Sequence, residues 1–78
     1  MKLRFFGRLR SLVEDGECDI DLPPDVATTE AVRSWFGRDH PDLLDQSVRM
    51  ALDDSLVLGD APLGAAREIA FLPPVSGG

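Results

Sequence analysis

The sequence predicts an α+β fold in which one mixed β-sheet has its helices packed on one face. Two segments near the ends of the chain indicate strands: apolar and polar residues alternate at 2–6, and at 68–72 Ile69 and Phe71 share one face while Ala70 and Leu72 share the other. Between them, Val32, Trp35 and Phe36 recur at the i, i+3, i+4 spacing of a helix. The chain has 78 residues, so we expect a single domain over 1–78, too small for its two helices to cover both sides of a sheet.

The N-terminal segment predicts a strand, a short helix and a second strand. The strand at 2–6 is followed by an apolar helical stripe over 9–13, and Asp15-Gly16 then marks a turn. The alternation of 17–22 predicts the second strand and places Cys18 on its inner face. A double proline ends this strand, because proline lacks the N–H that a strand ladder needs.

The central helix has clear start and stop signals. Either Thr28 or Thr29 can cap its first turn with a hydroxyl group. It should end near 37–39, because the residue before Pro41 avoids the helical region. Residues 41–46 are expected to add one further helical turn.

The second half of the chain predicts three strands. Alternation at 48–52 indicates the first of them, and Asp53-Asp54 turns the chain into a short strand at 56–58. A loop at 59–62 leads toward the last strand at 68–72. Because the first and last strands both look well buried, we expect them to pair in the middle of the sheet.

Charge and composition exclude several classes of function. The formal net charge is −6, and phosphate binding needs clustered Lys and Arg, so no nucleic-acid partner is expected. An acidic surface either favours a basic partner or simply keeps a small domain soluble. No stretch is apolar enough to span a bilayer, and residues 1–6 lack the pattern of a signal peptide. We therefore expect a cytoplasmic protein with no membrane partner.

Few side chains offer catalytic or metal-binding chemistry. Cys18 is the only cysteine, and its place on a strand favours a buried structural thiol over a nucleophile. His40 lies before a proline at a helix end, where a capping or exposed role is expected. Asp53-Asp54 is better explained as a turn than as a cation site. We expect no metal site, and we expect Trp35 and Phe36 to lie in the core.

The most informative residues follow the last strand, where the chain runs Pro73-Pro74-Val75-Ser76-Gly77-Gly78. Two prolines end the sheet and hold the backbone extended, so 73–78 should form a C-terminal tail that reaches about 20 Å from the domain. Two glycines lack side chains and suit a channel little wider than backbone. Five residues are therefore expected to insert into a partner protein: Pro73, Pro74, Val75, Ser76 and Gly77.

A glycine carboxylate at the end of such a tail becomes reactive only after activation. ATP can convert the Gly78 carboxylate into an acyl-adenylate, and a sulfur donor can then displace AMP to leave a thiocarboxylate. A terminal Gly-Gly on its own is weak evidence for such a role and is better explained as a frayed end. The stiff double proline directly after a buried strand favours a working tail.

Residues 71–78 closely resemble the C-terminus of the MoaD family, the small subunits of molybdopterin synthase. Residues 2–7 resemble the family's first strand, 51–57 its middle segment and 60–63 the loop that follows. The resemblance covers nearly the whole chain and extends to the related ThiS-like sulfur carriers. It implies a β-grasp, ubiquitin-like fold, in agreement with the order of strands and helices.

The resemblance also implies a function. Gly78 would be the catalytic position, adenylated by a MoeB-like adenylyltransferase and sulfurylase and converted to 1-thioglycine. The tail would then enter a MoaE-like large subunit, where sulfur passes to cyclic pyranopterin monophosphate in molybdenum cofactor biosynthesis. On its own the chain would be no enzyme, but the sulfur-donating small subunit of a heteromeric sulfurtransferase, expected as a heterotetramer. No bound cofactor is implied beyond the covalent glycyl adenylate and 1-thioglycine states.

Two departures from the family pattern concern the last turn. Many members have Asp-Gly-Asp-Glu where this chain has Ala65-Ala66-Arg67-Glu68, and many have Asn in place of Asp53. A changed turn and a changed local hydrogen bond are expected there. Phe6 and Leu72, on the sheet face away from the helices, are the candidate partner interface.

Other functions share the same features. The thiocarboxylate could serve thiamine, cysteine or tRNA thiolation, or the chain could be a ubiquitin-like modifier joined to lysines. It could also be an interaction domain with an irrelevant tail. The Pro-Pro-Val-Ser sequence before the glycines favours molybdopterin synthase, because carriers of the other pathways often lack it.

Overall fold

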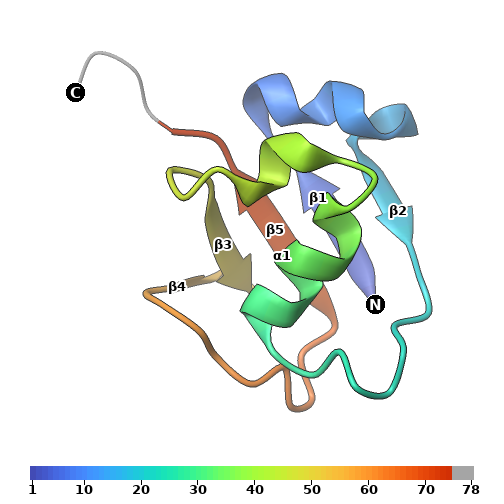
Figure 1. The fold of residues 1–78 in the computed structure, drawn as a ribbon, viewed down its shortest axis with the longest axis vertical. Coiled ribbons are helices and arrows are strands. Elements are labelled where there is room, and N and C mark those ends of the chain that lie inside the picture. The colour runs from blue at the N-terminus through green and yellow to red at the C-terminus, as the bar shows by residue number, and fades with distance from the viewer. Residues whose placement is uncertain (75–78) are drawn as a thin grey trace.

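A computed structural model describes residues 1–74 as one twisted sheet with helices on one side (Figure 1). The strands lie in the order β2-β1-β5-β3-β4. Their bounds are β1 Lys2–Phe5, β2 Glu17–Asp19, β3 Arg49–Leu52, β4 Ser55–Val57 and β5 Glu68–Leu72. The helical elements of these residues are α1 Thr29–Gly37 and three 3₁₀ helices, η1 Gly7–Leu12, η2 Glu14–Gly16 and η3 Pro41–Leu44.

Strands β1 and β5 form the parallel centre of the sheet. Leu3 pairs with Ile69 and Phe5 with Phe71, whereas the other strand pairs are antiparallel. The sheet is therefore mixed, and the predicted pairing of the first and last strands is confirmed. The last strand has exactly the predicted bounds, so the tail begins at the middle strand of the sheet.

The core lies between the sheet and α1, on the face that Figure 1 shows in front of the sheet. Ten buried residues form it: Leu3, Phe5, Leu9, Val32, Leu43, Val48, Met50, Leu63, Ile69 and Phe71. Phe36 packs against this cluster as predicted. Trp35 is only half-buried and lies outside the cluster, so its placement in the core was wrong.

The start of α1 is held by two adjacent threonines. The Thr28 hydroxyl accepts a hydrogen bond from the Ala31 N–H at 3.2 Å, which confirms the predicted cap. Thr29 is fully buried, and its hydroxyl accepts from the Ala61 N–H at 3.1 Å. Another hydrogen bond joins the helix start to the loop between β4 and β5: Asp60 Oδ1 accepts from the Glu30 N–H at 3.0 Å. This loop is thereby fixed to the helix start.

The connection between β1 and β2 is wound more tightly than predicted. The expected helix is a 3₁₀ helix that begins at Gly7 with φ +56°, and Val13, at φ −136°, ends it.

The second strand, β2, ends at Asp19, three residues before its predicted end at Leu22. The reason is that its partner β1 begins at Lys2, so only Met1 remains beyond it to pair with Ile20, through hydrogen bonds in both directions between their backbone groups.

A buried arginine, which the sequence did not single out, joins α1 to the chain that enters β3. Arg33 is 5% exposed, and its guanidinium donates to the carbonyls of Leu43 at 2.9 Å, Asp45 at 2.8 Å and Val48 at 2.7 Å. Its Nε lies 3.3 Å from a Glu30 carboxylate oxygen, in an ion pair without hydrogen-bond geometry. The Arg33 guanidinium thus supplies these backbone carbonyls with the hydrogen bonds that neighbouring strands or helical turns supply in regular structure.

The turn between β3 and β4 also positions the start of β5. Asp53 and Asp54 have φ of 44° and 72°, the left-handed conformations of a tight hairpin turn. Asp53 Oδ1 accepts the N–H groups of Arg67 at 3.0 Å and Glu68 at 3.1 Å. A carboxylate therefore makes the local hydrogen bonds at this turn. No helix within residues 1–74 has the length and apolar character needed to cross a membrane.

Candidate functional site

The candidate site begins where β5 ends and the tail leaves the sheet. Leu72 is the last strand residue, and Pro73 and Pro74 follow it in non-strand conformation. Both prolines lie at the start of the C-terminal tail, as the sequence predicted. We call this point, where Pro73 follows Leu72, the tail root. The other predicted tail residues, Val75, Ser76, Gly77 and Gly78, lie outside the residues that the structure describes.

Aromatic stacking anchors the tail root in the core. The Phe71 ring stacks on Phe5 at 5.2 Å with an angle of 10° between the rings, and Phe5 stacks on Phe36 at 5.7 Å. Phe71 is fully buried and Phe5 is 2% exposed. Because close-packed aromatic rings resist displacement, the point at which the tail begins is rigidly placed.

The outer face of the sheet carries a row of three side chains at this point. Arg49 pairs with Leu72 across β3 and β5. On the other side, the Phe6 N–H donates to the Phe71 carbonyl at 3.1 Å, which continues the β1–β5 ladder by one residue. Phe6 and Leu72 are both half-buried. The two residues predicted for the partner interface are therefore brought together at the tail root, with Arg49 beside them.

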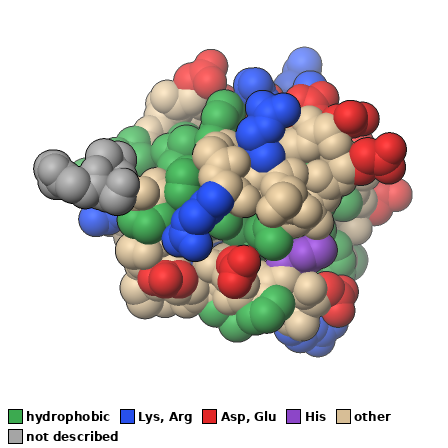
Figure 2. Space-filling model, turned by 90° about the horizontal axis from the view of Figure 1, so that it is seen from above, with side chains coloured by type: hydrophobic (Ala, Val, Ile, Leu, Met, Phe, Trp, Pro, Cys, Tyr) green, Lys and Arg blue, Asp and Glu red, His purple; other side chains and the backbone are tan. Residues whose placement is uncertain are grey.

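Leu56 extends this apolar face to the edge of the sheet, and the sequence analysis missed it. It pairs with Ala51, which pairs with Ala70 on the same outer face, and it is 57% exposed. The signal was an apolar residue on the outward side of a short hairpin strand. We call Phe6, Leu56 and Leu72 the docking patch. Seen from the tail end, hydrophobic side chains gather beside the grey residues, with basic side chains among them (Figure 2).

Arg4 forms one border of the docking patch. Its guanidinium lies 5.1 Å from the centre of the Phe6 ring, a cation–π contact. It also lies 3.8 Å from a Glu17 carboxylate oxygen and 3.6 Å from one of Glu68. These contacts fix the orientation of Phe6, the aromatic member of the patch.

The other candidate residues lie away from the tail root or serve the fold. His40 stacks on Phe36 at 4.6 Å and precedes η3. Burial raises the pKa of the half-buried Cys18 thiol, and the Asp19 carboxylate raises it further, which disfavours a reactive thiolate. Residues 1–74 contain no group of three or more His, Cys, Asp or Glu side chains placed to hold a metal ion.

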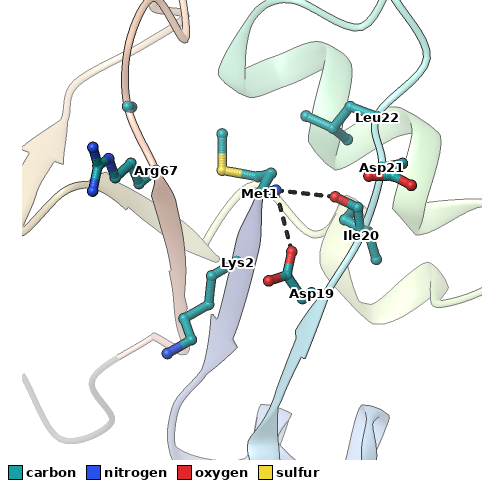
Figure 3. A pocket seen from close by; sticks show the side chains of 8 residues that line it. Met1, Lys2, Asp19, Ile20, Asp21, Leu22 and Arg67 are labelled. Atoms are coloured by element: carbon teal, nitrogen blue, oxygen red, sulfur yellow. Dashed lines mark hydrogen bonds and ion pairs between the residues drawn. The ribbon is translucent and has the colours of Figure 1, made fainter.

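A hollow lies at the opposite end of the sheet (Figure 3). It measures about 550 Å³ and is lined by Met1, Lys2, Asp19, Arg67 and their neighbours. The Met1 amino group donates to the Ile20 carbonyl at 3.0 Å and to Asp19 Oδ1 at 3.3 Å, as Figure 3 shows. The hollow borders the start of β1 and β5, whereas the tail leaves from their other end. It is therefore not part of the candidate site.

Comparison with known proteins identifies the group to which this architecture belongs. Residues 3–78 match the ThiS family. The chain belongs to the ThiS family. It is 34% identical over 82 residues to the molybdopterin synthase sulfur carrier subunit of Escherichia coli strain K12, covering all of this chain and 99% of that protein.

Membership of the ThiS family confirms two expectations from the sequence. The mixed five-stranded sheet with its helix on one face is the β-grasp, ubiquitin-like fold that the resemblance implied. The protein is a sulfur carrier of the ThiS and MoaD type. The sequence predicts that the chemistry lies on the tail, so the tail root and the docking patch are the described part of the candidate site.

Proposed function

We propose that this protein carries sulfur as a thiocarboxylate on Gly78 and donates it in molybdopterin synthesis. The observation that carries the proposal is the geometry of the tail root. The central strand β5 is locked into the core by Phe71 and leads directly into Pro73-Pro74. Full-length similarity to a molybdopterin synthase sulfur carrier subunit supports the same pathway.

The proposed cycle begins with activation of the carboxylate. A MoeB-like enzyme transfers AMP from ATP to the Gly78 carboxylate and releases pyrophosphate. A sulfur donor then attacks the carbonyl carbon and displaces AMP, which leaves the thiocarboxylate. Gly77 and Gly78 have no side chains, so the carbonyl carbon is open to attack in a narrow site.

The second half of the cycle takes place on another protein. The loaded tail enters a MoaE-like large subunit, and the sulfur attacks a carbon of cyclic pyranopterin monophosphate, where a C–S bond forms as a C–O bond breaks and the oxygen leaves protonated or as phosphate. Hydrolysis of the acyl–sulfur bond restores the Gly78 carboxylate and leaves sulfur on the product. Two rounds supply the two sulfurs of the dithiolene. In this scheme the small subunit supplies position and sulfur, and side chains of the partner supply acid and base.

A reconstitution experiment tests the destination of the sulfur. The loaded protein is mixed with the large subunit and cyclic pyranopterin monophosphate, and molybdopterin is measured by its oxidised fluorescent product. We expect product in proportion to the thiocarboxylate supplied. If no product forms while a thiamine, cysteine or tRNA thiolation system accepts the sulfur, the molybdopterin assignment is wrong.

A further inference from the structure

The length of chain after Pro74 limits how far a partner can lie from the sheet. Four residues extend from Pro74 to Gly78 and span at most about 13 Å. Any protein that reads Gly78 must therefore press against the residues around the tail root. These include the outer-face row of Phe6, Leu72 and Arg49.

Arg49 differs from Arg4, which lies on the same face. Arg4 is engaged by Glu17, Glu68 and the Phe6 ring. Arg49 is exposed, and within residues 1–74 no acceptor lies within hydrogen-bonding or ion-pair distance of its guanidinium. It stands directly across from Leu72. The row at the tail root thus presents a guanidinium whose hydrogen-bonding groups are not used by the described fold.

We propose that Arg49 pairs with a carboxylate of the molybdopterin synthase large subunit, at the rim of the cleft that receives the tail. This inference rests on the proposed function and adds the charge of the partner surface to it. The apolar neighbours Phe6 and Leu72 exclude water when the surfaces meet, which strengthens a charge-assisted hydrogen bond. A planar guanidinium matches a carboxylate with two parallel hydrogen bonds, so the pair also fixes orientation.

This assignment reverses the simplest interpretation of the net charge. A protein with net charge −6 suggests a basic partner. Arg49, however, is an exposed positive charge directly across from Leu72, and Glu17 and Glu68, two carboxylates of the same face, are already paired with Arg4. The surface that meets the partner therefore combines apolar side chains with an exposed positive charge. It suits a partner whose cleft has a carboxylate at its rim.

The test measures binding of the full-length carrier to the isolated large subunit, with no sulfur transfer involved. Three variants are compared with the wild type: Arg49→Glu, Arg49→Gln and the control Arg38→Glu. Arg38 is an exposed arginine that follows α1, on the helix side of the sheet. We expect Arg49→Glu to raise Kd about 30-fold or more, Arg49→Gln to raise it less, and Arg38→Glu to change it by less than about threefold.

Two outcomes overturn the proposal: an unchanged Kd for Arg49→Glu, or an equal loss for Arg38→Glu. If Arg49→Glu weakens binding, a carboxylate-to-arginine substitution on the large subunit should restore it, and no restoring position at the cleft rim would also contradict the pair. Thermal unfolding of each variant checks that the fold is kept. Wild-type sulfur transfer, measured separately, reports on the proposed function, so an unchanged Arg49→Glu with normal wild-type transfer rejects only the arginine pair.

Discussion

Gly7 and Pro73 meet so closely that a Cβ atom at position 7 would lie 2.7 Å from Cγ of the proline ring. Gly7 also has φ +56°, a conformation that other residues adopt at a cost. Pro73, the first residue of the tail, therefore packs directly against the backbone of Gly7 at the start of η1. This contact and the Phe71 stack together set the direction in which the chain leaves β5.

Gly7→Val should disturb the tail root more than the fold. We expect the left-handed conformation to cost about 1–2 kcal/mol of stability, and the side chain to displace Pro73 and lower the rate of sulfur transfer at least severalfold. Gly64→Val is the matched control, because Gly64 has φ +53° and nothing within 4 Å of its missing Cβ. Equal transfer rates in the two variants would show that the Pro73 contact does not matter.

Arg33→Met should destabilise the fold strongly. The carbonyls of Leu43, Asp45 and Val48 would each lose a hydrogen-bond donor, although that of Asp45 would keep the Val48 N–H, at a cost of roughly 3 kcal/mol or more. Urea unfolding measures the change in the free energy of unfolding. Arg38→Met, at an exposed position, should change it by less than about 0.5 kcal/mol. A small effect at Arg33 would mean that water satisfies the carbonyls.

Leu56→Ser should weaken binding of the large subunit and leave the fold intact. Leu56 is 57% exposed on the docking patch, and Leu44, on η3, is a comparably exposed control at 46%. We expect about a tenfold rise in Kd for Leu56→Ser, because the buried apolar contact is lost, and little change for Leu44→Ser. Calorimetric titration with the large subunit gives both values. The patch is wrongly assigned if the two variants bind alike.

Stability should fall in acid through Asp60. The Glu30 N–H is the main group that lowers the pKa of Asp60, and the hydroxyls of Thr28 and Thr29 lower it further. A carboxyl with a lowered folded-state pKa stabilises the fold above its unfolded pKa of about 4, and that contribution is lost as the pH falls through the folded-state value.

The corresponding measurement compares the Tm of the wild type and Asp60→Asn from pH 7 to pH 2. The difference should be largest near neutral pH and should shrink below about pH 4. A difference that stays constant across this range would show that the charge of Asp60 contributes nothing to the helix start.

The sequence predicted the periodic parts of the fold well. Alternation located β1 and β3, a short apolar segment located β5, and the Thr28 cap and Pro41 bracketed α1. Each of these signals is local, since it depends on residues within one element. The pairing of β1 with β5 followed from their apolar character alone.

The missed features depend on contacts between distant segments. Arg33 lies in a helical pattern that looks solvent-exposed, and only the fold brings three carbonyls to it. The shortened β2 follows from where its neighbour β1 begins, not from its own alternation. Leu56 joins the docking patch only through the register of β3 with β4 and β5. The sequence could identify the tail, but not the surface around its root.

The most direct test of the central claim is the intact mass of the protein after incubation with ATP, a sulfide source and a MoeB-like enzyme. We predict replacement of one oxygen by sulfur, located on Gly78 by fragmentation of the C-terminal peptide. A variant lacking Gly78 and a variant with one residue added after it should stay unmodified, while both keep the wild-type Tm. Sulfur found on Cys18, or no mass change in a wild-type protein that ends at Gly78, would contradict the carrier mechanism.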